Sequence, residues 1–385
     1  MNHRMMTSLL PAIVLILSLA SCDRSASKEE PASLTYQNPI VEGIDPHGLR
    51  DCQVLREGDF WYMTGTSWPH WSRQEQGDTL NPGVALYRST DLSSWEFVSY
   101  IVPRPGPDSW YYNRFWAPEI QKIQGKFYVL FNCRNDSLGF VGQHPGYGVS
   151  DQIEGPYDII TRDAPLTNGN DLTFFEDTDG KVWAFWNQGR EFGIGFAQID
   201  LATGSFLTEP ISAIRPAEVT FEYDDLGQLV KVPGYDGRPI PKVAIYHDWD
   251  AIGIEGAYVI KNGDTYYLFY SSWTRGYEIG YATAPAITGP WIKYEGNPLY
   301  GAQNPQTCSH NGLPYTGDPA SPFIAVGHNA IFTGPDGGTW LSCHGILKGG
   351  NPMLVIDPLT FQPDGVITAN GPTYTPQTVT WGDEK

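Results

Sequence analysis

The chain has 385 residues, with 24 Lys and Arg against 43 Asp and Glu, and therefore a net charge of −19. This balance offers no basic face for a nucleic acid, and the 14% aromatic content excludes a disordered chain. The 42 Gly and 31 Pro exclude a coiled coil and favour a turn-rich soluble domain built from many short strands.

The N-terminal segment is predicted to be a targeting signal. Residues 1–21 combine a basic start with an apolar run at 9–20, which is the pattern of a secretory signal peptide. Cys22 follows this run directly, as in the lipobox of bacterial lipoproteins, while an ordinary secretory signal is the alternative. We therefore expect a lipoprotein signal peptide over 1–21, a flexible tether over 22–33, and an exported protein attached to a membrane by a lipid on Cys22.

Four further cysteines are scattered along the rest of the chain. They could pair in three ways, and their spacing matches no zinc site. They are Cys52, Cys133, Cys308 and Cys343.

From residue 34 to 385, the chain repeats one unit five times. Each unit opens with an alternating run, turns at a glycine, and returns in a second run that begins with an apolar or aromatic pair. A third strand, and often a fourth, follows each hairpin. Four strands in each of five units, without a long amphipathic helix, predict an all-β fold, the five-bladed β-propeller. A β-helix has shorter repeats, and a β-sandwich has no reason to repeat one hairpin five times. The hairpins lie at 51–67, 117–133, 171–187, 255–272 and 328–345.

Aligning the units on that pair brings one position of each first strand into register. Because the first strand of a blade lies nearest the axis, we expect these side chains at one mouth of the central channel. Three of them are carboxylates, which suits glycoside hydrolysis: one acid protonates the leaving oxygen, one carboxylate activates water, and the third raises the pKa of the acid. A calcium site and a row of strand-capping residues are the alternatives. The five aligned residues are Asp51, Ala117, Asp171, Glu255 and His328.

The motifs around these positions are more specific than their spacing. Trp116-Ala117-Pro118-Glu119 opens the second unit, Glu255-Gly256-Ala257 the fourth, and Gly327-His328-Asn329 includes the aligned position of the fifth. Together with Asn38-Pro39-Ile40, they resemble glycoside hydrolase family 43, the five-bladed propellers that act on arabinose- and xylose-containing glycans. The similarity runs over 36–367, and the family's opening strand would close the ring beside the last blade.

The resemblance implies roles for four of the aligned residues. Asp51 matches the general base, Glu255 the general acid, and Asp171 the acid that positions the proton donor and tunes its pKa. His328 matches the histidine that faces the axis beside a structural calcium and its waters. The implied enzyme is an inverting exo-acting or debranching α-L-arabinofuranosidase or β-D-xylosidase that needs no organic cofactor and acts on an oligosaccharide or polysaccharide.

Four residues are candidates for binding the substrate. Trp116 matches the pocket tryptophan of the family, and Trp71 belongs to the aromatic loops of the first two units, where a ring can stack on a sugar. Glu119 is a candidate pocket acid. His247 lies in the long segment 208–254, which could form a lid or a subsite wall.

One departure from the family puts the sugar in doubt. An arginine often enters the pocket from the last blade, but the stretch 351–358 contains none. A propeller hydrolase for another sugar, such as a galactosidase or a fructosidase-like enzyme, is therefore one alternative. A glycan-binding lipoprotein without activity is the other.

Overall fold

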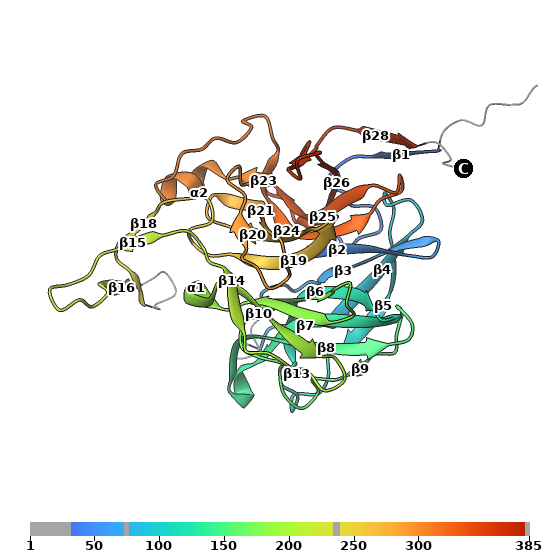
Figure 1. The fold of residues 1–385 in the computed structure, drawn as a ribbon, viewed down its shortest axis with the longest axis horizontal. Coiled ribbons are helices and arrows are strands. Elements are labelled where there is room, and N and C mark those ends of the chain that lie inside the picture. The colour runs from blue at the N-terminus through green and yellow to red at the C-terminus, as the bar shows by residue number, and fades with distance from the viewer. Residues whose placement is uncertain (1–31, 73–76, 234–238, 382–385) are drawn as a thin grey trace, which may run out of the picture.

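The computed structural model describes residues 32–72, 77–233 and 239–381. These residues form five antiparallel blades arranged around one axis (Figure 1), and the predicted five-bladed β-propeller is confirmed. The predicted signal peptide at 1–21 and the proposed lipid anchor at Cys22 lie outside the described residues. Strand β1 begins at Ala32, inside the predicted tether.

Each predicted hairpin forms the first two strands of a blade, and the second strand pairs with a third. Blade 1 contains β2 (Arg50–Glu57), β3 (Phe60–Thr66), β4 (Gly83–Ser89) and β5 (Glu96–Pro103). Blade 2 contains β6 (Asn113–Ile123), β7 (Lys126–Asn135), β8 (Phe140–Ser150) and β9 (Asp158–Ile159). Blade 3 contains β10 (Asn170–Glu176), β11 (Val182–Asn187), β12 (Ile194–Asp200), β13 (Ser205–Phe206) and β14 (Ile211–Ile214).

The last two blades are joined by a single pairing between Ala302 and Val326. Blade 4 contains β19 (Glu255–Asn262), β20 (Thr265–Ser272), β21 (Gly276–Ala284), β22 (Ile292–Lys293) and β23 (Tyr300–Gln303). Blade 5 contains β24 (Phe323–Thr333), β25 (Thr339–Leu347), β26 (Pro352–Phe361) and β27 (Ile367–Ala369).

The N-terminal segment closes the ring on blade 5, as the resemblance implies. Strand β1 (Ala32–Tyr36) pairs with β28 (Gln377–Trp381), and Ile40 bridges to Leu354 of β26. The side chain of Asn38 donates to the carbonyl oxygen of Ile356 at 2.8 Å and accepts from its amide at 3.1 Å. The first and last described strands are therefore paired with each other beside blade 5.

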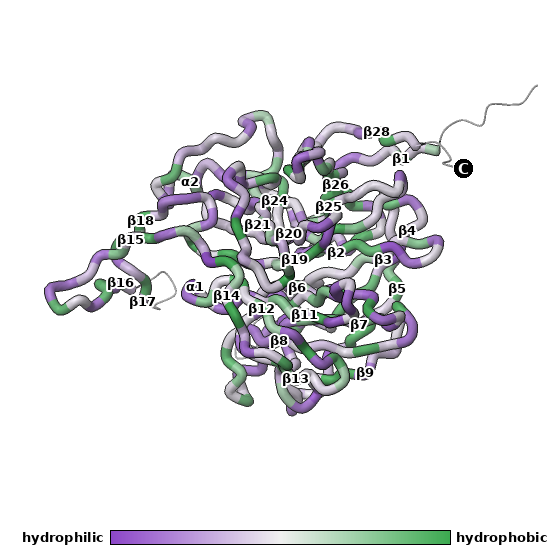
Figure 2. The backbone as a smooth tube through the Cα atoms, in the orientation of Figure 1, coloured by the Kyte–Doolittle hydropathy of each residue, from purple (hydrophilic) through white to green (hydrophobic). Residues whose placement is uncertain are grey.

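The apolar side chains of the strands fill the spaces between neighbouring blades. Five buried clusters form, one for each boundary of the ring, and Figure 2 shows apolar stretches along the blade strands. Tyr147 and Trp186 lie in the cluster between blades 2 and 3, and Trp340 lies between blades 5 and 1. Most large aromatics thus stabilise the ring, because flat rings bury a large area between two sheets.

The segment between blades 3 and 4 forms an extended insertion, which we call the arm. Strand β15 (Val219–Phe221) pairs with β18 (Ala244–Tyr246), and β16 (Lys231–Pro233) pairs with β17 (Pro239–Pro241). In Figure 1, this arm projects away from the blades.

Helices are short in the described ranges. They are η2 (Asp136–Leu138), α1 (Gly189–Phe192) and α2 (Pro305–His310), and none has the length and hydropathy needed to cross a membrane. The four cysteines of the blades are buried and free, so none of the three pairings forms.

Candidate active site

The first strand of every blade is interrupted at the same place by a β-bulge. The strand register shifts there in β2, β6, β10, β19 and β24, and one residue adopts a left-handed backbone. A bulge bends its strand and re-aims the side chains beside it. The repeated bulge therefore turns the side chains at equivalent positions of four blades toward one cavity, and in blade 4 it turns the residue before the left-handed glycine there. The left-handed residues are Asp51 (φ 54°), Ala117 (φ 40°), Asp171 (φ 56°), Gly256 (φ 63°) and His328 (φ 63°).

The bulge corrects the alignment made from the sequence. Glu255 precedes the left-handed position of its blade by one residue, because it pairs with Ser271 as Arg50 pairs with Thr66. The structural equivalents of Glu255 are therefore Arg50, Trp116 and Asn170, not Asp51 and Asp171. Glycine suits position 256 because the backbone there is left-handed, a conformation that glycine adopts without steric cost.

Hydrogen bonds across the blade boundaries hold the bulges in place. In four blades, the amide of the left-handed residue donates to a side chain on the second strand of the preceding blade. In blade 4, the amide of Gly256 donates to Asp171 Oδ2 at 3.0 Å instead. The four other pairs are Ala117 with Thr66 (2.7 Å), Asp171 with Asn132 (2.9 Å), His328 with Ser271 (3.0 Å) and Asp51 with His344 (3.0 Å).

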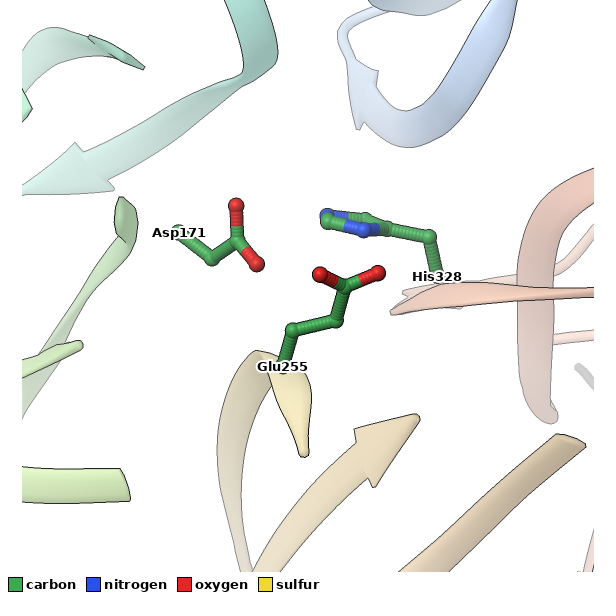
Figure 3. A group of neighbouring side chains, drawn as sticks. All are labelled: Asp171, Glu255 and His328. Atoms are coloured by element: carbon green, nitrogen blue, oxygen red, sulfur yellow. The ribbon is translucent and has the colours of Figure 1, made fainter. Parts of the chain in front are cut away.

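The bulges place Asp51, Asp171 and His328, with Glu255, around a cavity of about 70 Å³ at the axis, which we call the acid pocket. Asp171, Glu255 and His328 converge there from three different blades (Figure 3). The structure therefore brings together six of the eight site residues predicted from the sequence, and adds Arg50 beside them. The six are Asp51, Asp171, Glu255, His328, Trp71 and Trp116.

Asp51 is held in an environment that favours its ionised form. Thr66 Oγ1 donates to its Oδ2 at 2.6 Å, and the Nδ1 atoms of His344 and His328 lie 3.3 Å and 3.6 Å from its Oδ1. Burial would raise the pKa of Asp51, but the charge of His328, together with that of Arg50, outweighs burial and holds it well below the usual range. Asp51 can therefore accept a proton at neutral pH.

Glu255 is tuned in the opposite direction. Burial, and then repulsion from the carboxylate of Asp171, raise its pKa to about 7. Tyr277 donates a hydrogen bond to Glu255 Oε1 at 2.6 Å, which opposes part of this shift. Glu255 therefore keeps a proton that it can donate near neutral pH.

Asp171 lies beside the strand that carries Glu255 and interacts with that acid. Burial raises its pKa, and its Oδ2 accepts the amide of Gly256 at 3.0 Å. With its amide group oriented to satisfy its neighbours, Asn187 also donates to this oxygen at 3.1 Å. These bonds fix the carboxylate of Asp171 beside the strand that carries Glu255, where it raises the pKa of that acid.

His328 is the buried group that balances these acids. Burial would lower its pKa, but the surrounding carboxylates outweigh burial and raise it. Its ligand atom lies within 4.8 Å of those of Asp171 and Glu255, so the three side chains could hold a metal ion. Calcium prefers six to eight oxygen ligands. This group offers an imidazole and two carboxylates, one of which carries a proton, so a directly bound calcium does not fit it.

Trp71 and Trp116 form an aromatic wall of the acid pocket. Their rings meet edge to face with centroids 4.9 Å apart, and Trp116 Nε1 donates to the carbonyl oxygen of His70 at 2.7 Å. Trp71 is 57% exposed, which leaves a face open at the entrance. Such a face can stack on a sugar ring.

The other two predicted substrate residues do not line the acid pocket. Glu119 is buried in β6, where Gln121 donates to it at 3.0 Å and burial raises its pKa to about 7. The Nε2 atom of His247 lies 2.7 Å from Thr220 Oγ1 at the base of the arm. The structure thus places Glu119 inside the ring of blades and His247 outside the pocket.

Four residues of the site were missed by the sequence reasoning. Arg50 directly precedes Asp51, so its position beside the first acid was a usable signal. Thr66, Tyr277 and His344 lie on second or third strands and reach the acids across the sheet or from another blade. No pattern near those acids in the sequence points to them.

Known proteins are similar to this chain over most of its length. The family model for Glycosyl hydrolases family 43 matches residues 36–367. Xylosidase/arabinosidase 43B of Humicola insolens is 27% identical over 320 residues, which cover 79% of this chain and 48% of that protein. Non-reducing end alpha-L-arabinofuranosidase BoGH43B of Bacteroides ovatus is 25% identical over 324 residues, covering 82% of this chain and 48% of that one.

A solved structure agrees with these sequence comparisons. A thermostable family-43 glycoside hydrolase superposes with a TM-score of 0.64 at 25% identity, covering 89% of this chain and 98% of that one. The chain spans about half the length of the two curated relatives above. Because the family model matches well over half of its residues, the chain belongs to glycosyl hydrolase family 43.

Proposed function

We propose that this family 43 member is an inverting glycoside hydrolase that removes a terminal α-L-arabinofuranosyl or β-D-xylosyl unit from a polysaccharide-derived glycan. One observation carries the proposal: two carboxyl groups that line one pocket have pKa values shifted in opposite directions, that of Asp51 downward and that of Glu255 upward. The relatives named above act on xylosides and arabinosides by their names, which supports a pentose. The small acid pocket favours one terminal sugar.

In the proposed mechanism, the two carboxyl groups act on opposite faces of the sugar. Glu255 gives its proton to the glycosidic oxygen as the bond from that oxygen to the anomeric carbon breaks. Asp51 takes a proton from a water molecule, whose oxygen attacks the anomeric carbon. Asp171 and Tyr277 hold Glu255 in place, and the proton on Asp51 returns to Glu255 through solvent after the products leave.

A panel of 4-nitrophenyl glycosides tests the proposed function. We expect hydrolysis of the α-L-arabinofuranoside or the β-D-xyloside, with little activity on galactosides, glucosides or fructosides. Proton NMR of the first product formed should show the anomer opposite to that of the substrate, because water attacks once from the far side. Retention of the anomer, or binding of oligosaccharides without release of reducing sugar, would overturn the proposal.

Tyr277→Phe should move the basic limb of the pH profile upward. The Tyr277 hydroxyl donates to the carboxylate of Glu255, and a hydrogen bond to the charged form lowers a pKa. Removing it should raise the pKa of Glu255 above about 7 and keep the acid protonated to higher pH. The measurement is kcat/KM against pH on the best substrate of the panel. An unchanged limb in a folded variant would show that Tyr277 does not tune the acid.

Two further features are proposed for this protein: a structural calcium ion near the axis and attachment to a membrane through a lipid. A calcium ion near His328 would have to be held through water, since the donor set around that ring does not suit direct binding. The pattern at 1–21 supports export, and Cys22 supports a lipid anchor. Neither proposal enters the reaction steps described above.

A further inference from the structure

A second cavity shares part of its wall with the acid pocket. Its volume is about 390 Å³, which lies in the range of small-molecule sites. We call it the side compartment. Arg50, Trp71 and Glu255 line both cavities, so the proton donor stands where the two meet. The residues of the side compartment that matter below are Arg50, Trp71, Glu255, Trp273, Tyr277 and His344.

This shared wall determines which sugar each cavity receives. In the proposed function, on which this inference rests, Glu255 protonates the oxygen between two sugars. The terminal sugar occupies the acid pocket with Asp51 and Asp171. The sugar that leaves must also lie next to Glu255, and the side compartment is the second cavity that Glu255 lines.

The guanidinium of Arg50 is a donor without an acceptor. It stacks on Trp71, with Cζ 5.0 Å from the ring centroid. No described residue gives it a hydrogen bond or an ion pair, although the charge of Asp51 lies nearby. A guanidinium has five N–H donors in a planar fork that matches a carboxylate with two parallel bonds.

His344 adds a second unused donor. It is fully buried, and its Nδ1 accepts the amide of Asp51 at 3.0 Å, which places the ring proton on Nε2. Burial, with the charge of Arg50, lowers its pKa to about 4, so the ring is neutral. Its Nε2 has no partner among the described residues. A buried donor without an acceptor is unfavourable.

The compartment therefore offers donors, one positive charge and two indole rings, but few acceptors. Its one carboxyl group is Glu255, which keeps its proton and is bonded to Tyr277. Trp273 is 39% exposed and Trp71 is 57% exposed, which leaves ring surface for a sugar face. A neutral sugar would use these rings but would leave the charge of Arg50 unmatched.

We propose that the side compartment binds the carboxylate of a uronic acid, which forms the leaving-group side of the bond that is cut. Arg50 donates two parallel hydrogen bonds to the carboxylate, and Trp71 and Trp273 contact the sugar ring. The substrate class is thus a pentosyl unit attached to an acidic sugar. Local charge decides this preference, because the net charge of −19 would otherwise repel an anion.

The test measures binding of D-glucuronate and D-galacturonate against D-glucose and D-galactose by calorimetry. At least one uronate should bind about 10- to 100-fold more tightly than its neutral counterpart, as expected for hydrogen bonds to a charged group. Arg50→Gln should reduce this preference to within about twofold, because the amide lacks the charge and the fork. Arg56→Gln is the matched control: Arg56 lies in the same strand as Arg50, stacks on Trp61 of β3 at 4.9 Å from that ring, and lines neither cavity.

Four outcomes separate this inference from the proposed function. Equal binding of acidic and neutral sugars overturns the inference, and so does a preference that survives in Arg50→Gln. Hydrolysis of a 4-nitrophenyl pentoside, with no preference for uronates, rejects the inference alone. Absence of pentoside hydrolysis rejects the proposed function, while the binding measurement, which needs no turnover, still reports on the compartment.

Discussion

Asp51→Asn is expected to lower kcat at least ~10²-fold on every substrate, as for loss of a general base. Asparagine keeps the size of the side chain and can still bond to Thr66, but it cannot take a proton from water. The loss should be the same for oligosaccharides and for 4-nitrophenyl glycosides, because both need an activated water molecule. The measurement is kcat on one substrate of each kind, with the melting temperature as a check on folding.

Asp45→Asn is the matched control for that variant. Asp45 lies six residues before Asp51 in the sequence, and its carboxylate is partly exposed and bonds to the ring of His47 at 3.0 Å. It does not line the acid pocket. Near-normal activity of Asp51→Asn, or a comparable loss in Asp45→Asn, would contradict the assignment of the base.

Glu255→Gln is expected to lower kcat at least ~10²-fold on oligosaccharides, because the leaving sugar needs a proton. The loss should be much smaller on aryl glycosides whose phenol has a low pKa, since such a phenolate leaves without help. Comparing kcat across a series of aryl leaving groups measures this difference. A uniform loss across the series would show that Glu255 is not the proton donor.

The pH dependence follows from the same group. With a pKa of about 7, Glu255 is protonated below that value, so wild-type activity should fall as pH rises through it. The native state also holds this proton more tightly than the unfolded chain, whose ordinary pKa is 4.5. Stability is therefore lost as pH rises from about 4.5 through about 7. At pH 8, Glu255→Gln should have a higher melting temperature than the wild type, because the neutral amide needs no proton.

Glu119→Gln separates stability from catalysis. Burial raises the pKa of Glu119 to about 7 as well, but the residue does not line the acid pocket. Its replacement should stabilise the protein at pH 8 without steepening the dependence on the leaving group. A catalytic loss that depends on the leaving group in Glu119→Gln would mean that this acid, and not Glu255 alone, serves the reaction.

The repeated hairpin pattern of the sequence predicts those parts of the structure that neighbouring residues form. The repeated hairpins predict five blades, because each hairpin is formed by neighbouring residues and needs only alternation and a glycine turn. The same periodicity brings Asp51, Asp171 and His328 into register at their bulges. The periodicity misplaces Glu255 by one residue. Counting back from the second strand assumes regular pairing, and it cannot reveal the position of a β-bulge in the first strand.

The partners of these acids come from elsewhere in the ring. Thr66 and His344 hold Asp51 from the second strands of blades 1 and 5, and Tyr277 holds Glu255 from the third strand of blade 4. His344 is 293 residues from Asp51 along the chain. Such contacts depend on closure of the ring and on side-chain direction, neither of which leaves a local pattern.

The sequence by itself therefore determines the kind of groups that meet at the axis: carboxylates, a histidine and tryptophans on a repeated hairpin. Only the tertiary structure decides what those groups do. Two similar carboxyl groups acquire pKa values on opposite sides of the ordinary range, because burial and a neighbouring anion act on Glu255 while two imidazoles and a guanidinium surround Asp51. Burial and proximity are properties of the closed ring, so the division into base and acid arises with the fold.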